Sequence, residues 1–144
     1  MNLKKFYMVV VAAFVAGIVF VSFSLFSSKA DAYVDVSNDD FTNEENTVSR
    51  EIEISRWSNL LTVSLDSDPT TGYEWEIVDP EKQNIVAVSG DNYKAPLTDG
   101  TCGQEVWTFN VLKSGTCLIS MEYSQPWEGG IKALHKLDVT VVAQ

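Results

Sequence analysis

A stiff turn that displays two hydroxyl side chains is the part of this sequence best suited to contacting another molecule. It consists of Asp68, Pro69, Thr70, Thr71, Gly72 and Tyr73. Proline fixes φ near −65° and glycine tolerates positive φ, so Pro69 and Gly72 constrain the two threonines between them. A constrained turn with small hydroxyl groups suits a binding tip, although an ordinary β-turn can have the same composition.

Two further loops have compositions that favour binding. One covers residues 95–104 and contains Gly100, Thr101, Cys102 and Gly103. The other contains Gln125, Pro126 and Trp127, followed by Glu128 and two glycines. No strand pattern buries Trp127, and an exposed tryptophan is a frequent anchor in interfaces. The alternative is a tryptophan that folds back as a lid on the end of the domain.

Residues that could support catalysis or metal binding are few. Cys102 and His135 could form a nucleophile and base pair, but nothing in the sequence places them together. Clustered His/Cys spacing typical of metal sites is missing, and the acidic pairs at residues 39–40 and 44–45 are interpreted as solvated rather than calcium-binding. The sequence therefore predicts no enzyme, no catalytic residue, no metal and no cofactor.

The strands that must position these loops are indicated by short segments in which apolar and polar residues alternate. Apolar residues recur with period two, which is typical of half-buried strands, in the following rows: Ile52 and Ile54; Leu61, Val63 and Leu65; Tyr73, Trp75 and Ile77; Val86 and Val88; Trp107, Phe109 and Val111; Cys117, Ile119, Met121 and Tyr123; Leu137, Val139 and Val141. About seven strands without helices predict an all-β fold, an immunoglobulin-like antiparallel β-sandwich.

The order of the strands predicts where the three loops lie. Strands run up and down, so alternate connections emerge at the same end of a sandwich. The second and third loops flank a pair of strands expected to form a hairpin that turns near Ser114. They should therefore lie side by side, and the simplest arrangement puts the first loop at the same end, giving three functional loops there.

The same hairpin predicts the state of the two cysteines. In that register Cys117 lies opposite Val111, about nine positions from Cys102. At roughly 3.3 Å per residue the separation is about 30 Å, far beyond the limit of about 7 Å between bridged Cα atoms. We expect no intramolecular disulfide, with Cys117 as a buried thiol and Cys102 exposed in its loop.

The N-terminal region is typical of an exported protein. Lys4 and Lys5 precede an uncharged apolar run over residues 6–26, and Ala30 and Ala32 follow in an A-x-A pattern. We interpret residues 1–32 as a signal peptide cleaved after Ala32, with an uncleaved membrane anchor as the alternative because the run is long enough to span a bilayer. The remaining domain is expected to be secreted or exported, and membrane-tethered if the segment is retained.

Charge and composition divide the rest of the chain. Residues 33–50 are acidic and weakly patterned and are interpreted as a tether, leaving residues 51–144 as the β-sandwich domain. Leaving out Lys4, Lys5, Lys29 and Asp31 gives 7 basic and 19 acidic residues over 33–144, a net charge of −12. That balance excludes nucleic acid as a partner, because phosphates require basic surface. We expect the free protein to be a monomer.

The three loops, in this order, resemble those of the chagasin-type inhibitors of papain-like cysteine proteases. That family carries an N-P-T-T-G-[YF]-x-W loop, a G-x-G-G loop before a strand and an R-P-W loop after the next strand. This chain has DPTTGYEW at 68–75, GTCG at 100–103 and QPW at 125–127. It departs from the pattern with Asp68 in place of asparagine, Cys102 in place of glycine and Gln125 in place of arginine.

The resemblance implies a reversible, tight-binding protein inhibitor that plugs the cleft of papain-like, cathepsin-like proteases with three loops. Thr70, Thr71 and Gly72 would lie across the catalytic cysteine. The loop at 100–103 would pair with the non-primed rim of the cleft, and Trp127 would pack on the primed side. The alternative is an immunoglobulin-like extracellular adhesion or recognition module, which has no reason to carry all three motifs.

Overall fold

The structure is a computed structural model that describes residues 31–42, 45–55, 58–80 and 84–144. The expected signal peptide lies outside the described residues except for its last two positions. The described residues form eight strands: β1 (Ala32–Val36), β2 (Thr47–Ile54), β3 (Leu60–Ser67), β4 (Glu74–Val78), β5 (Val86–Lys94), β6 (Gly103–Val111), β7 (Gly115–Ser124) and β8 (His135–Ala143). Two short 3-10 turns, η1 (Asn38–Asp40) and η2 (Pro69–Thr71), complete the regular structure, and the described residues contain no α-helix.

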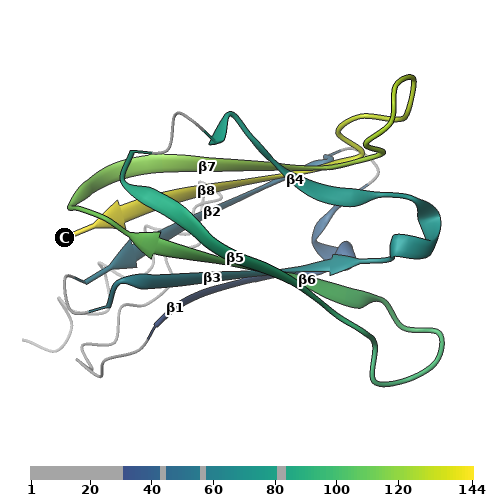
Figure 1. Ribbon diagram of the computed structural model, residues 1–144, viewed down its shortest axis with the longest axis horizontal. Helices are drawn as coiled ribbons and strands as arrows, with labels where there is room; N and C mark the ends of the chain where they lie inside the picture. Colours follow the sequence, from purple (N-terminus) through teal and green to yellow (C-terminus); the bar gives the residue numbers. More distant parts are fainter. Residues whose placement is uncertain (1–30, 43–44, 56–57, 81–83) are drawn as a thin grey trace, which may run out of the picture.

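The strands form two four-stranded sheets with the orders β1-β3-β6-β5 and β2-β8-β7-β4, which face each other as a sandwich (Figure 1). The prediction of an all-β sandwich is confirmed. Four of the six strand pairs are antiparallel, whereas β1–β3 and β2–β8 are parallel. In the described residues no helix is long and apolar enough to span a bilayer.

The core lies between the sheets and includes most residues of the rows that alternation predicts. Its fully buried side chains include Leu61, Val63, Leu65, Phe109, Ile119, Met121, Leu137, Val139 and Val141. β5 differs from the expected short strand, since it extends to Lys94 and its register shifts between Val88 and Gly90. Val88 directly precedes this irregularity on an edge strand and is 42% exposed.

The expected hairpin between β6 and β7 is wrong. The two strands belong to opposite sheets, so the turn at 112–114 crosses between the sheets, and Cys117 lies opposite Val141 of β8. A period-two row looks the same whether its partner is the next strand or a distant one, so alternation could not tell these arrangements apart. Both cysteines are free, as predicted, but Cys117 is half-buried rather than buried.

The segment expected to be an acidic tether contributes strands to both sheets. All of β1 except Ala32, and the first residues of β2, lie within 33–50, and Val34, Val36 and Val48 are buried in the core. Asp35 alternates with these valines and is exposed. Asp35 therefore occupies the outer face of a strand, whereas Asp39 and Asp40 lie in η1. Acidic composition does not distinguish this arrangement from a solvated linker.

Strand register brings four connections to one end of the sandwich, at the right of Figure 1. Ser67 pairs with Gly103, which puts the first loop beside the second. Glu74 pairs with Ser124, which puts the first loop beside the third. The connection between β1 and β2 emerges here as well, because β1 ends beside the end of β3 and β2 begins beside the start of β8.

Candidate functional site

The first loop, residues 68–73, is closed by its own side chains. Asp68 caps η2, since Asp68 Oδ1 accepts hydrogen bonds from Thr70 N–H at 3.0 Å and from Thr70 Oγ1 at 2.6 Å. Thr71 Oγ1 donates to the Asp68 carbonyl at 2.6 Å. The turn ends at Gly72, whose φ of 79° is left-handed and favours glycine. Aspartate thus caps this turn as asparagine would, and both threonines stay exposed.

The base of the first loop is tied to both sheets. The Asp68 N–H donates to the Tyr123 hydroxyl at 3.1 Å, and the Trp75 indole N–H donates to the Asp66 carbonyl at 3.1 Å. Tyr73 stacks on Tyr123 with ring centroids 5.3 Å apart. A loop held in this way loses little conformational freedom when it binds a partner.

Trp127 joins the third loop to the first. A Cβ atom placed on Gly72 would lie 2.6 Å from Trp127 Cη2, so the indole lies directly against the Gly72 backbone. The side chain is still 50% exposed. It is therefore an exposed tryptophan fixed in place by the first loop, and it does not close over the core as the lid alternative would require.

Gln125 holds the third loop closed. Its Oε1 accepts from the Ile131 N–H at 3.0 Å, and its own N–H donates to the Ile131 carbonyl at 2.8 Å. The Lys132 ammonium donates to the Gln125 carbonyl. Gln125, which replaces the arginine of the resembled pattern, thus forms its hydrogen bonds within the third loop. These bonds hold the loop that carries Trp127 in a closed conformation.

The second loop, residues 95–102, is exposed throughout. Gly100 has a φ of 85°, and both the N–H and the Oγ1 of Thr101 donate to the Thr98 carbonyl. Cys102 is not among the residues with positive φ, so the backbone there does not require the glycine of the resembled pattern. Leu97 is fully exposed in this loop, a feature that the sequence analysis did not single out.

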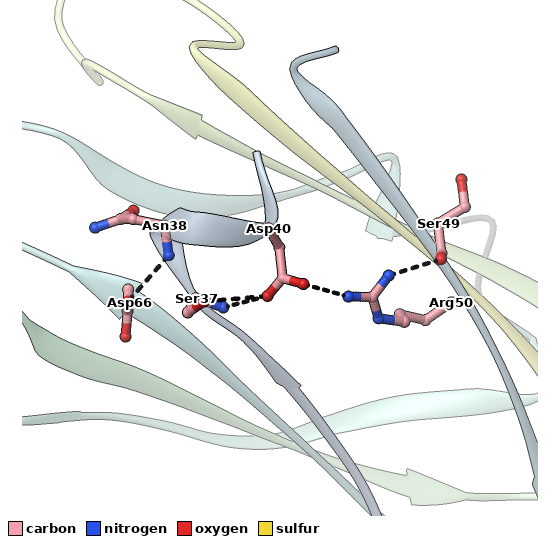
Figure 2. A network of polar contacts seen from close by, with 6 residues as sticks. All are labelled: Ser37, Asn38, Asp40, Ser49, Arg50 and Asp66. Atoms are coloured by element: carbon pink, nitrogen blue, oxygen red, sulfur yellow. Dashed lines mark hydrogen bonds and ion pairs between the residues drawn. The ribbon is translucent and has the colours of Figure 1, made fainter. Parts of the chain in front are cut away.

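The connection between β1 and β2 forms a fourth loop at the same end, described over residues 37–42 and 45–46 and shown in part in Figure 2. The Ser37 N–H donates to Asp40 Oδ2 at 2.9 Å, and Arg50 pairs with Asp40 Oδ1 at 2.7 Å. These contacts lower the pKa of Asp40, the Ser37 backbone N–H most strongly. The Asn38 N–H donates to Asp66 Oδ2 at 3.0 Å, which fixes the fourth loop to β3.

The fourth loop also contacts the two loops beside it. Asn38 Nδ2 donates to Cys102 Sγ at 3.4 Å, and Asn46 Nδ2 donates to the Ala133 carbonyl at 3.2 Å. Phe41 stacks on His135 with centroids 4.2 Å apart. This role is not evident from the sequence, because the acidic, weakly patterned composition of residues 33–50 is typical of a tether.

The structure gives no support to catalysis or metal binding at this end. His135 stacks between Phe41 and Tyr123. Cys102 lies in the second loop and contacts Asn38 of the fourth loop instead. Among the described residues, no group of three or more His, Cys, Asp or Glu side chains could hold a metal ion. What the end of the sandwich presents is a rigid, irregular surface formed by loops.

The two thiols should react at different rates. We expect a disulfide reagent to modify Cys102 at least about tenfold faster than Cys117, because Cys102 is exposed while burial raises the pKa of the Cys117 thiol. Absorbance of the released thiol should show one fast and one slow phase, and Cys102→Ser should remove only the fast one. Two equal rates would contradict the exposure seen here.

His135 should make stability depend on pH. Burial lowers the pKa of His135 from 6.5, and Nδ1 is buried without a hydrogen-bond partner among the described residues. The unfolded chain therefore takes up a proton first as pH falls below 6.5, so the free energy of unfolding should decrease there and level off below the folded pKa. Urea titrations should show this decrease in the wild type.

The matched variant for the pH measurement is His135→Phe, which keeps a ring against Phe41. Burial of Glu105 raises its pKa and gives a contribution of opposite sign, but this contribution cancels when wild type and variant are compared. The difference in stability should grow in favour of the variant as pH falls through 6.5. A difference that stays constant with pH would contradict a lowered pKa for the half-buried His135.

Comparison with known proteins gives three consistent matches. Residues 56–141 match the family described as chagasin family peptidase inhibitor I42. Amoebiasin-2 of Entamoeba histolytica is 35% identical over 91 residues, which cover 60% of this chain and 72% of that protein. The crystal structure of the cysteine protease inhibitor EhICP2 from Entamoeba histolytica is 27% identical with a TM-score of 0.57, over 78% of this chain and 96% of that one.

Proposed function

The chain belongs to the chagasin family of peptidase inhibitors, and from this premise we propose that it is a reversible, tight-binding inhibitor of papain-like cysteine proteases. Its family makes it an inhibitor and not an enzyme. The observation that carries the proposal is the contact of Trp127 with Gly72, because it unites the first and third loops at the end of the sandwich that also holds the second.

The inhibitor plugs the protease cleft with three loops. Thr70, Thr71 and Gly72 lie across the catalytic cysteine and deny it access to substrate. The loop at Gly100–Gly103 follows the rim of the cleft, and Trp127 packs on the opposite side, flanked by Gln125 and Pro126. Inhibition is steric, and the closed hydrogen bonding of the first loop supports it, since ordered loops lose little entropy on docking.

The relatives support this target class over an adhesion module. EhICP2 is a cysteine protease inhibitor, and its structure covers 78% of this chain. The family match at 56–141 spans all three loops. A general adhesion sandwich would need only the strands, so the adhesion alternative is not favoured.

Three finer features are part of the proposal. The targets are cathepsin-like members of the protease class. The protein acts as a monomer, because one chain supplies all three loops at one end. It is exported, since the basic, apolar and small residues of 1–32 have the order of a signal peptide or an N-terminal anchor.

Titration of the purified protein against papain tests the proposal. Hydrolysis of a small peptide substrate should fall in proportion to the inhibitor added, and activity should return on dilution with the inhibitor uncleaved by mass spectrometry. A serine protease such as trypsin is the control and should keep its activity. Papain that remains fully active at micromolar inhibitor would reject the proposal.

A further inference from the structure

Glu105 is an acidic residue in an inward-facing row of the core. It lies on β6 two residues before Trp107 and four before Phe109, so alternation turns its side chain toward the space between the sheets. It also lines an open surface hollow of about 940 Å³ that Pro69, Gly72 and Trp127 border at the loop end. The three-loop function gives this carboxylate no part.

The Glu105 carboxylate joins the two strands that carry the first loop. Its Oε1 accepts from Ser67 Oγ at 2.6 Å, and its two oxygens lie 3.4 and 3.3 Å from the Trp75 N–H. Ser67 is the last residue of β3, and Trp75 is the second residue of β4. These strands lie in opposite sheets, so the carboxylate bridges the sandwich directly beneath the loop.

We propose that Glu105 is the positioning residue of the inhibitory first loop, a carboxylate that sets the separation of Ser67 and Trp75 and thereby the shape of the turn between them. The inference rests on the proposed function, because it assigns to Glu105 the ordering of the loop that blocks the protease. Glu105 itself need not touch the protease.

The chemistry of the position argues for this role over simple packing. An ionised carboxyl group in a partly buried site is costly unless it is hydrogen-bonded. Burial raises the pKa of Glu105, while the hydrogen bonds from Ser67 and Trp75 act in the opposite direction. An apolar side chain in this row would avoid that cost but could not accept either bond. The two acceptor oxygens of a carboxylate satisfy both donors at once.

Binding kinetics separate a positioning residue from a contact residue. When the loop adopts its binding shape only part of the time, the association rate constant falls to that fraction of its original value, while the dissociation rate constant stays nearly unchanged. Loss of a direct contact acts mostly on dissociation. Glu105→Ala should therefore slow association with papain about tenfold and change dissociation less than about threefold. Glu105→Gln keeps one acceptor oxygen and should lie between wild type and Glu105→Ala.

Hydrogen exchange on the free protein provides a second measurement that needs no protease. The Trp75 amide should exchange faster in both Glu105 variants, because the acceptor of its N–H is removed or weakened. Glu76→Gln is the matched control, since Glu76 is an exposed carboxylate on the same strand β4. It removes the same charge and should change neither association nor Trp75 exchange.

The outcomes are distinguishable. A wild-type protein that does not inhibit papain rejects the proposed function, and Trp75 exchange then decides alone whether Glu105 orders the loop. If the wild type inhibits, the inference requires slower association together with faster Trp75 exchange. Unchanged association, unchanged exchange or an equal effect in Glu76→Gln would each overturn it. Should Glu105→Ala fail to fold, the same comparisons with Glu105→Gln decide.

Discussion

Replacing Trp127 by alanine should weaken inhibition of papain by about 2 kcal/mol or more, which raises the inhibition constant about 30-fold. Large aromatic side chains at the centre of an interface contribute most of its binding energy, and half of the Trp127 surface is free for a partner. Its indole is already fixed against Gly72, so little side-chain entropy is lost on docking. Most of the effect should appear as faster dissociation.

Leu118→Ala is the matched control, because it removes exposed apolar surface that is not expected to contact the protease. Leu118 is 53% exposed on β7 and pairs with Thr140 of β8, away from the loops. Leu118→Ala should leave the inhibition constant unchanged, and both variants should keep the wild-type melting temperature within a few degrees. An inhibition constant for Trp127→Ala within about threefold of wild type would reject the anchor role.

Local sequence signals predicted the features that depend on neighbouring residues. The period-two rows placed Leu61, Phe109 and Val139 in the core, and all three are fully buried. The cap formed by Asp68 and the left-handed Gly72 follow from the preferences of aspartate and glycine in turns. These features are decided within a few residues, where side-chain chemistry limits the choices of the backbone.

Features that depend on distant partners could not be predicted in the same way. Nothing in the row from Cys117 to Tyr123 shows that its neighbours are β8 and β4 and not β6. The valines of β1 were visible in the sequence, but only their pairing with β3 shows that Asp35 between them lies on an outer face. Glu105 could have been recognised, because the alternation that buries Phe109 also turns residue 105 inward.

The loop end depends on contacts between elements that are far apart in the sequence. Asp68 is tied to Tyr123 of β7, Ser67 to Glu105 of β6, and Cys102 to Asn38 of the fourth loop. A surface formed from separate segments keeps its shape only if the segments fix one another. The three motifs can therefore work together only in the folded sandwich, and their joint presence in this order is a stronger indication of function than the second motif alone.

Gly72→Ala should raise the inhibition constant about 100-fold while the protein remains folded. The φ of 79° costs an L-residue about 1–2 kcal/mol. In addition, the new Cβ atom would lie 2.6 Å from Trp127 Cη2, so the indole must move from its place. One methyl group thus strains the blocking turn and displaces the aromatic anchor. Inhibition of papain and a circular dichroism melt of the variant provide the measurement.

Gly129→Ala separates the effect of backbone strain from the effect of the clash with Trp127. Gly129 also has a left-handed φ, 77°, but a Cβ atom there would meet nothing within 4 Å, so the variant introduces strain in the third loop without a clash. Its inhibition constant should rise less than about fivefold. In a double-mutant cycle, Gly72→Ala should cost less in the Trp127→Ala background, because no indole remains to be displaced. Strictly additive effects would show that the contact between Gly72 and Trp127 does not shape the inhibitory surface.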